Sequence, residues 1–179
     1  MPNGRFHSKT GKYLKDAVYG ANDGIVTTFA VVAGVAGAAL SPVTIIILGV
    51  ANLFADGFSM AASNFLASRS ERDFYTKQNA SRAWEAANPE PLKSAAITLI
   101  AFVGAGFLPI LPYVGIPANG ASFRWSIALA GISFFVVGAL RTLFTAKSWL
   151  WSGMEMLVVG GLASGIAYIT GYVVRMLVG

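Results

Sequence analysis

The chain has 179 residues, of which 55% are hydrophobic and only 12% are charged, and it contains 20 glycines. Soluble domains carry about 25% charged residues, so this composition is typical of an integral membrane protein and argues against a disordered chain. Because there is no cysteine and only one histidine, the sequence excludes disulfides, thiolate metal sites, thiol catalysis and a histidine-rich metal cage.

Five apolar stretches are long enough to cross a bilayer as helices, which takes about 20 residues. They predict a single all-α membrane domain, residues 1–179, with spans at about 17–40, 43–67, 94–110, 122–142 and 154–174. Ser41 and Pro42 separate the first two spans and predict a tight helical hairpin. The loop 68–93 is the longest polar stretch and the one candidate for a structured element outside the membrane.

The basic residues predict the orientation. With five spans, the N-terminus, the 68–93 loop and the 141–151 connection share one side of the membrane, and together they hold 11 of the 13 Lys and Arg residues. The positive-inside rule then predicts a cytoplasmic N-terminus and an outer or lumenal C-terminus. The same bias explains the net charge of +5 by topology and by contact with anionic membrane lipid, so we expect no nucleic-acid partner.

Two carboxylates lie inside the predicted spans, Asp23 in the first and Asp56 in the second. A carboxylate near a helix centre costs about 2.5–3.5 kcal/mol on insertion scales, so intramembrane acids are functional by default. The second span carries a polar stripe with a four-residue repeat, made of Asn52, Asp56, Met60 and Asn64. If the two spans pack as a hairpin, Asp23 lies level with Met60, and Asp56 lies about one turn deeper.

This set of side chains is suited to a transition metal. Carboxylate oxygens bind hard cations such as Fe²⁺ and Mn²⁺, while a thioether favours softer ions. Asp23, Asp56 and Met60 therefore fit a transition metal that crosses the membrane better than Mg²⁺ or Ca²⁺. The alternative is that both acids are protonated, or hydrogen-bonded to Ser, Thr and Asn within a helix interface, and that Met60 is ordinary packing.

Small residues surround the acids. Gly20 and Gly24 flank Asp23 at a GxxxG spacing, which predicts the close approach of another helix. A helix from a second copy of the chain is one candidate for that neighbour. Gly57 and Ala61 predict a similar contact on the second span.

The 68–93 loop holds half of the acidic residues of the chain, namely Glu71, Asp73, Glu85 and Glu90. One interpretation is a cytoplasmic surface that collects cations. The other, which we favour because five basic residues accompany the four acids, is a solvated helical extension with mixed charges. Elsewhere, Glu155 is expected to open the last span, where the helix dipole favours a carboxylate, and Arg141 to close the fourth.

Two stretches resemble signature sequences of the vacuolar iron transporter family. The run YGANDGIVTTFAVVAG, residues 19–34, is similar to the first-helix signature, and NLFADGFSM, residues 52–60, continuing to Glu71, is similar to the second. Weaker similarities at residues 91–96 and 160–163 extend the resemblance over nearly the whole chain.

The resemblance implies a five-helix homodimer that moves Fe²⁺, and often Mn²⁺, out of the cytosol, commonly in exchange for protons, along a path between the subunits. It implies that Asp23 and Met60 are metal ligands. Iron-transporting members often have a glutamate two turns before the methionine; here that position is Asn52, so the acidic ligand is expected at Asp56, one turn closer. Glu71 ends the second-helix signature and is the expected entrance ligand.

The 68–93 loop is shorter than the glutamate-rich metal-binding insert of many members, so the chain resembles the short form, similar to nodulin-like members. This form fits the plasma membrane of a prokaryote, with a vacuolar membrane as the alternative. The expected partners are a divalent metal ion as substrate, membrane lipid and a second copy of the chain, with no bound cofactor. A non-transporting scaffold or partner subunit and a passive channel are the other functions considered; no arrangement of catalytic residues indicates an enzyme.

Overall fold

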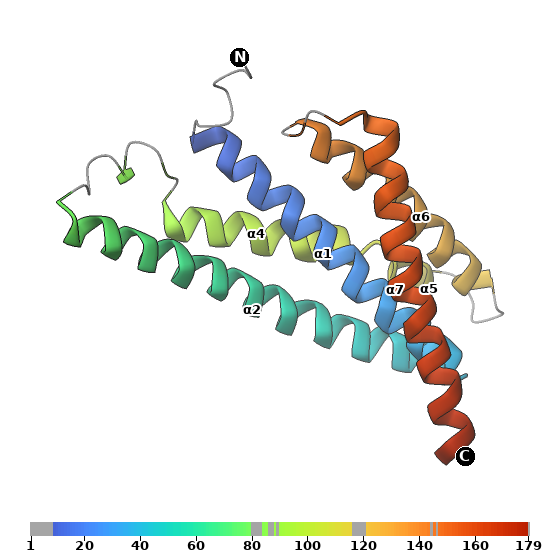
Figure 1. Cartoon of the computed structure of the whole chain (residues 1–179). Coiled ribbons are helices and arrows are strands. Elements are labelled where there is room, and N and C mark those ends of the chain that lie inside the picture. Colours follow the sequence, from blue (N-terminus) through green and yellow to red (C-terminus); the bar gives the residue numbers. More distant parts are fainter. Residues whose placement is uncertain are drawn as a thin grey trace.

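The structure, a computed structural model, describes residues 9–79, 84–85, 88, 90–115, 121–143, 145 and 147–178. These residues form a bundle of helices and include no strand (Figure 1). Among them, four helices are long and apolar enough to cross a membrane: α1 (Lys9–Gly37), α2 (Pro42–Lys77), α6 (Ala121–Leu140) and α7 (Trp149–Val178). The all-helical class predicted from composition is confirmed, and the fold fits an integral membrane protein.

The third predicted span, 94–110, is a helix that begins and ends a few residues earlier than the sequence indicated. α4 (Pro91–Gly106) has 16 residues, and the chain then turns and continues as the short helix α5 (Leu111–Gly115). Pro109, which has no backbone N–H, lies in the turn between them. Its carbonyl oxygen accepts a hydrogen bond of 2.6 Å from the Ser126 hydroxyl of α6, so this turn is fastened to the neighbouring helix.

The predicted hairpin between the first two helices is present. Beyond α1, the backbone of Ala39 has a φ of 51°, and this left-handed conformation ends the helix. Ser41 then caps α2, because its side chain accepts a hydrogen bond from the Thr44 backbone N–H and Pro42 occupies the first helical turn. α2 is longer than its predicted span and continues from residue 67 to Lys77.

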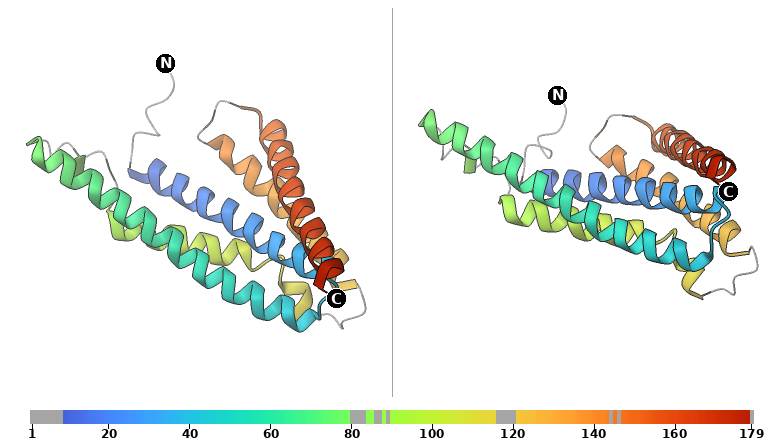
Figure 2. Two further views of the ribbon diagram at one scale, coloured as in Figure 1. Left: turned by 60° about the horizontal axis from the view of Figure 1, so that its bottom comes forward. Right: turned by 90° about the horizontal axis from the view of Figure 1, so that it is seen from below.

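α1 is the central helix of the bundle. It packs against α2 and α4 on one side and against α6 and α7 on the other (Figure 2). Its buried side chains, such as Ile25 and Val32, form the main core together with Phe134 of α6 and Met156 of α7. The outer helices are covered on fewer sides: half of the most apolar stretch of α1 is buried, against 11% for α7.

The helices alternate in direction along the chain. Gly24 of α1 meets Phe102 of α4, Asn64 of α2 meets Thr98 of α4, and Gly138 of α6 meets Ser152 of α7. The start of α1, the end of α2, the start of α4, the 3-10 turn η1 (Arg141–Leu143) and the start of α7 therefore lie at one end of the bundle, which we call the basic end. The described basic residues there are Lys9, Lys12, Lys15, Arg69, Arg72, Lys77, Lys93, Arg141 and Lys147.

The glycines beside Asp23 contact α4 of the same chain. A Cβ atom on Gly20 would lie 2.6 Å from the Thr98 carbonyl oxygen, and one on Gly24 would lie 2.3 Å from that of Phe102. The close helix approach predicted from the GxxxG spacing is thus confirmed, but the suggestion that a second copy fills this face is wrong, because α4 already occupies it. Gly57 of α2 packs on the side chain of Phe102, which also belongs to α4.

A second close contact joins α1 to α7 at the opposite end of the bundle. A Cβ atom on Gly171 would lie 2.0 Å from the Gly34 carbonyl oxygen, and one on Gly37 would lie 2.1 Å from that of Tyr168. Glycines at these positions let the two backbones touch. Both sides of α1 are therefore fixed by backbone contacts, and this fixes the position of the acids that it carries.

Candidate functional site

The structure brings the two predicted intramembrane acids together. Asp23 lies in the middle of α1 and Asp56 in the middle of α2, and both are half-buried. Their carboxylates are close enough to repel each other electrostatically. Two like charges held together in an apolar region are unfavourable unless a proton or a cation lies between them. A cation bound near both carboxylates would relieve this repulsion.

Asn52 lies one turn from Asp56 on the same helix and contacts it directly. Its side-chain Nδ2 donates a hydrogen bond of 2.8 Å to Asp56 Oδ2. Asp23 is in a different position, because the nearby Thr27 hydroxyl donates to the Asp23 backbone carbonyl oxygen, at 2.8 Å. Within the described part of the chain, the interpretation that both acids are hydrogen-bonded to neighbouring polar side chains thus has a side-chain donor for Asp56 only.

Met60 lies one turn from Asp56, on the side toward the basic end. It is half-buried and packs against the small apolar cluster that contains Leu53 of α2 and Phe102 of α4. This contact is the packing role that sequence analysis gave as the alternative. The ligand role of Met60 stays a prediction.

Glu71 is exposed and lies apart from the acid pair. Fifteen residues separate it from Asp56 on α2, which is about 22 Å at 1.5 Å per residue. It lines a cavity of about 400 Å³ at the basic end together with Lys12 and Asp16 of α1, Asn64 and Ser94. A single ion cannot touch Glu71 and Asp56 at once, so an entrance role is the one that its position allows.

Asp16 is the acid of this basic-end cavity, and its carboxylate is well hydrogen-bonded. It accepts hydrogen bonds from the Ser94 hydroxyl and the Asn64 side chain, and Asn64 Nδ2 also donates to the Thr98 hydroxyl at 2.8 Å. Sequence analysis did not predict this network. The residue spacing could have indicated it, since Asp16 shares a face of α1 with Asp23, and Asn64 belongs to the polar stripe of Asp56.

Two of the other acids that follow the second predicted span are paired with basic neighbours. Glu85 forms an ion pair with Arg72, with 3.1 Å between Oε1 and the guanidinium nitrogen, and Glu90 forms one of 3.0 Å with Lys93. The hydrogen bond from Lys93 to Glu90 raises the pKa of this exposed ammonium group. These pairs support the interpretation of a solvated surface with mixed charges rather than one that collects cations.

A metal site in one chain would rest on few acids. Within the described residues, no three His, Cys, Asp or Glu side chains are grouped so that they could hold a metal ion. Asp23 and Asp56 supply two carboxylates, and Asn52 supplies an amide group beside them. Further ligands would have to come from backbone oxygens, water, the Met60 thioether or a second copy of the chain.

The fold and the acid pair define a class: a helical membrane protein with two half-buried carboxylates, from different helices, inside its apolar region. Comparison with known families then identifies the chain. The model of the VIT family matches residues 14–90 and 85–172, so this chain belongs to the VIT family, whose members are transporters and not enzymes. The family resemblance expected from the two signature stretches is confirmed.

Relatives from plants and parasites are similar to nearly the whole chain. It is 27% identical to vacuolar iron transporter 1 of Arabidopsis thaliana, over 94% of this chain and 89% of the relative. It is 25% identical to the vacuolar iron transporter of Centaurea cyanus, over 90% and 88%, and 25% identical to that of Toxoplasma gondii, over 97% and 78%.

These alignments also show where the chain differs from its relatives. The match to the Centaurea cyanus protein extends over 215 positions, more than the 179 residues of this chain, so that relative has residues without a counterpart here. The two blocks of the family match meet at residues 85–90, within the 68–93 loop. This is the position at which the short form is expected to lack its insert.

Proposed function

We propose that this protein exports a divalent transition metal, Fe²⁺ and/or Mn²⁺, from the cytosol across the membrane, with Asp23 and Asp56 as the central ligands. The observation that carries the proposal is the pair itself, two half-buried carboxylates from different helices that repel each other. A divalent cation with a preference for oxygen ligands neutralises both charges at once. The names of the relatives, all of them iron transporters, support the same conclusion.

The pair also gives a physical basis for exchange with protons. A carboxylate in an apolar region is costly to keep ionised when no cation is near it, and a like charge nearby adds to that cost, so binding a proton is the alternative to binding a cation. Arrival of a divalent cation removes that cost and displaces the proton. When the cation leaves, the repulsion returns and a proton is taken up from the side to which the site is then open. Metal and proton movement are therefore coupled in opposite directions.

The transporting unit that we propose is a homodimer of five-span subunits with cytoplasmic N-termini. One chain supplies only two carboxylates to the proposed site, and a second copy would double that number. The gathering of nine described basic residues at one end of the bundle supports a cytoplasmic position for that end. The membrane we favour is the plasma membrane of a prokaryote; a vacuolar membrane, as in the names of the relatives, is the alternative.

Reconstitution tests this function. The purified protein is placed in liposomes with a trapped metal-sensitive dye, and Fe²⁺ or Mn²⁺ is added under an imposed pH gradient. We expect metal uptake that depends on the gradient and is lost in Asp23→Ala. The matched control is Asp73→Ala, which removes an acid from the exposed extension of α2 and is expected to transport like the wild type.

Two outcomes overturn the proposal. If well-folded protein takes up neither metal, the chain is a scaffold or a partner subunit. If uptake is unchanged in Asp23→Ala, the acid pair is not the transport site. Uptake that ignores the pH gradient removes the exchange mechanism while leaving the metal site in place.

A further inference from the structure

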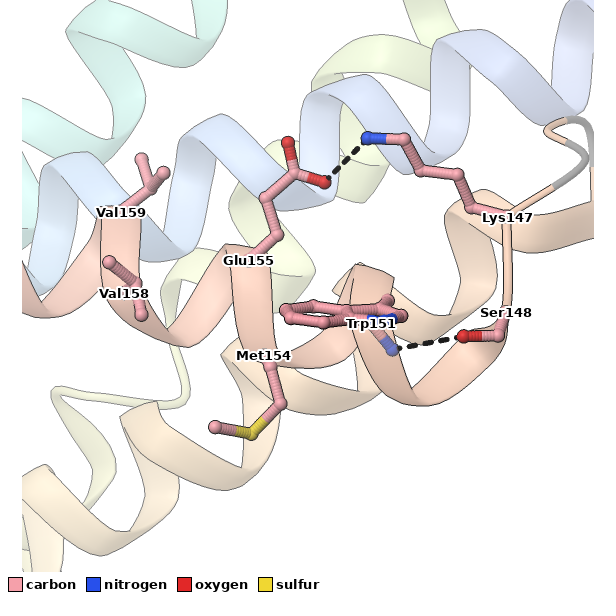
Figure 3. Close-up of a pocket in the computed structure, with 7 residues that line it drawn as sticks. All are labelled: Lys147, Ser148, Trp151, Met154, Glu155, Val158 and Val159. Carbon is pink, nitrogen blue, oxygen red and sulfur yellow. Dashed lines mark hydrogen bonds and ion pairs between the residues drawn. The ribbon is translucent and has the colours of Figure 1, made fainter.

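A cavity of about 620 Å³ opens beside the first turns of α7, far from the acid pair in the chain (Figure 3). Its lining has a polar part and an apolar part. Lys147, Ser148 and Glu155 provide the polar groups, while Met154, Val158 and Val159 provide an apolar wall. Nothing in the transport mechanism uses these residues.

The division follows the direction of the helix. Lys147 and Ser148 precede α7 at the basic end, whereas Val158 and Val159 lie about three turns further along it. A molecule in this cavity therefore meets polar groups at the membrane surface and apolar side chains toward the bilayer centre. A phospholipid, with a polar headgroup and an apolar acyl chain, has the same order of groups.

The cavity is lined by one basic and one acidic side chain, Lys147 and Glu155, and Arg141, which does not line it, adds one positive charge nearby. Lys147 Nζ lies 3.1 Å from Glu155 Oε2, as Figure 3 shows, and Arg141 also attracts the same carboxylate. The sequence expectation that Glu155 opens the last span is wrong: α7 begins at Trp149, so Glu155 lies beyond the first turn and contacts Lys147 instead. The Lys147 side chain is 60% exposed, so its ammonium group has room for a second acceptor.

The surroundings of the cavity are typical of a membrane surface. The indole of Trp151, which lines it, is 75% exposed, and Trp149 is 58% exposed; such residues are enriched at headgroup level. Further along α7, a Cβ atom on Gly161 or Gly165 would meet nothing within 4 Å. The surface of α7 is thus open at these two glycines beyond the cavity, which leaves space for an acyl chain.

We propose that this cavity binds one anionic phospholipid, with its phosphate at Lys147 and an acyl chain along Met154, Val158 and Val159, while Arg141 adds positive charge nearby. Basic pockets at the cytoplasmic side of membrane helices are known to hold anionic headgroups. A second copy of the chain fits less well, because a symmetric contact through this face brings the positively charged mouths of two subunits together. The phosphate competes with Glu155 for Lys147. Removing the charge of Lys147 should therefore weaken lipid binding, and removing the charge of Glu155 should strengthen it.

Native mass spectrometry of the detergent-solubilised protein tests the site, with equal amounts of phosphatidylglycerol and phosphatidylcholine as probes. We expect wild-type protein to retain phosphatidylglycerol in preference. Lys147→Gln should lower the retained fraction about fivefold, as expected for one basic residue near a membrane surface. Glu155→Gln should raise it, because the lysine loses its internal competitor. The matched control is Lys77→Gln, an exposed lysine at the same end of the bundle that should change nothing.

A second arm separates a lipid from its headgroup alone. Thermal unfolding of the wild type is followed with phosphatidylglycerol or with inorganic phosphate, and only the lipid should raise the Tm. Equal retention of the two lipids, a loss in Lys77→Gln equal to that in Lys147→Gln, or a fall in Glu155→Gln would each overturn the proposal. A Tm that rises with inorganic phosphate as much as with the lipid would do the same, since the apolar wall would then have no role.

Discussion

Two aspartates on one face of α1 have opposite surroundings. Asp16, near the basic end, accepts hydrogen bonds from Ser94 and Asn64. Asp23, about two turns deeper, is near enough to Asp56 for the two carboxylates to repel each other. The residue type, the helix and the face are the same, so the difference comes entirely from what the neighbouring helices present.

The comparison separates two roles that an acid can have inside a membrane protein. A carboxylate surrounded by donors is satisfied, and it holds together the helices that supply those donors. A carboxylate set against another carboxylate is unsatisfied until a proton or a cation arrives. Asp16 is therefore expected to act on stability and Asp23 on transport, and the following predictions test that division.

The largest effect is expected at the acid pair. Asp23→Ala and Asp56→Ala should each reduce metal uptake in proteoliposomes by more than about a hundredfold, because a buried divalent cation with one carboxylate left is not neutralised. Asp23→Ala should not lower the unfolding temperature, since it removes a repulsion, whereas Asp56→Ala also removes the acceptor of the Asn52 side chain. Loss of transport in Asp56→Ala alone, with normal transport in Asp23→Ala, would contradict a site built from both helices.

The second largest effect concerns the packing that positions both acids. Gly24→Leu places side-chain atoms where the Phe102 carbonyl oxygen already lies, and overpacking of this kind costs about 1–3 kcal/mol. We expect a lower thermal unfolding temperature and reduced transport together. Gly104→Leu on α4 is the control, because a Cβ atom there meets nothing within 4 Å. Equal unfolding temperatures for the two variants would show that the α1–α4 contact is looser than the structure indicates.

The third prediction concerns Asp16. Asp16→Ala leaves the buried hydroxyl of Ser94 without its acceptor, and an unsatisfied buried donor costs about 1–3 kcal/mol. Asp16→Asn keeps an acceptor oxygen and should be less destabilised. Unfolding temperatures and flux per folded molecule distinguish the two roles: flux should be close to wild type in Asp16→Asn. A loss of flux as complete as in Asp23→Asn would instead place Asp16 on the transport path.

Sequence patterns predicted what depends on local spacing. The five apolar stretches, the hairpin at Ser41 and the polar stripe around Asp56 can all be found by counting residues, because helix geometry fixes which side chains share a face. The proximity of Asp23 to Asp56 could be predicted only on the condition that the first two helices pack together as a hairpin.

What the sequence left open depends on contacts between distant segments. The GxxxG spacing at Gly20 and Gly24 indicates a close neighbour but does not identify it, and only the fold shows that α4 is that neighbour. The donors around Asp16 likewise come from other helices, Asn64 from α2 and Ser94 from α4. Glu155 was misplaced because its helix begins earlier than its hydropathy indicates, at Trp149.

The smallest effect is expected at Glu71. This exposed acid lies about 22 Å along α2 from Asp56, so it acts on the local concentration of metal and not on the central site. Glu71→Gln should raise the apparent KM for Mn²⁺ about twofold, within the range of an exposed charge, and leave kcat unchanged. The increase should disappear in 1 M salt, where the Debye length falls to about 3 Å. The control is Asp73→Asn, on the same exposed helical extension but outside the cavity of Glu71. An equal rise in KM in this variant would show that Glu71 acts only as a general surface charge and not as an entrance ligand. A loss of kcat in Glu71→Gln would show that transport depends on a ligand far from the acid pair.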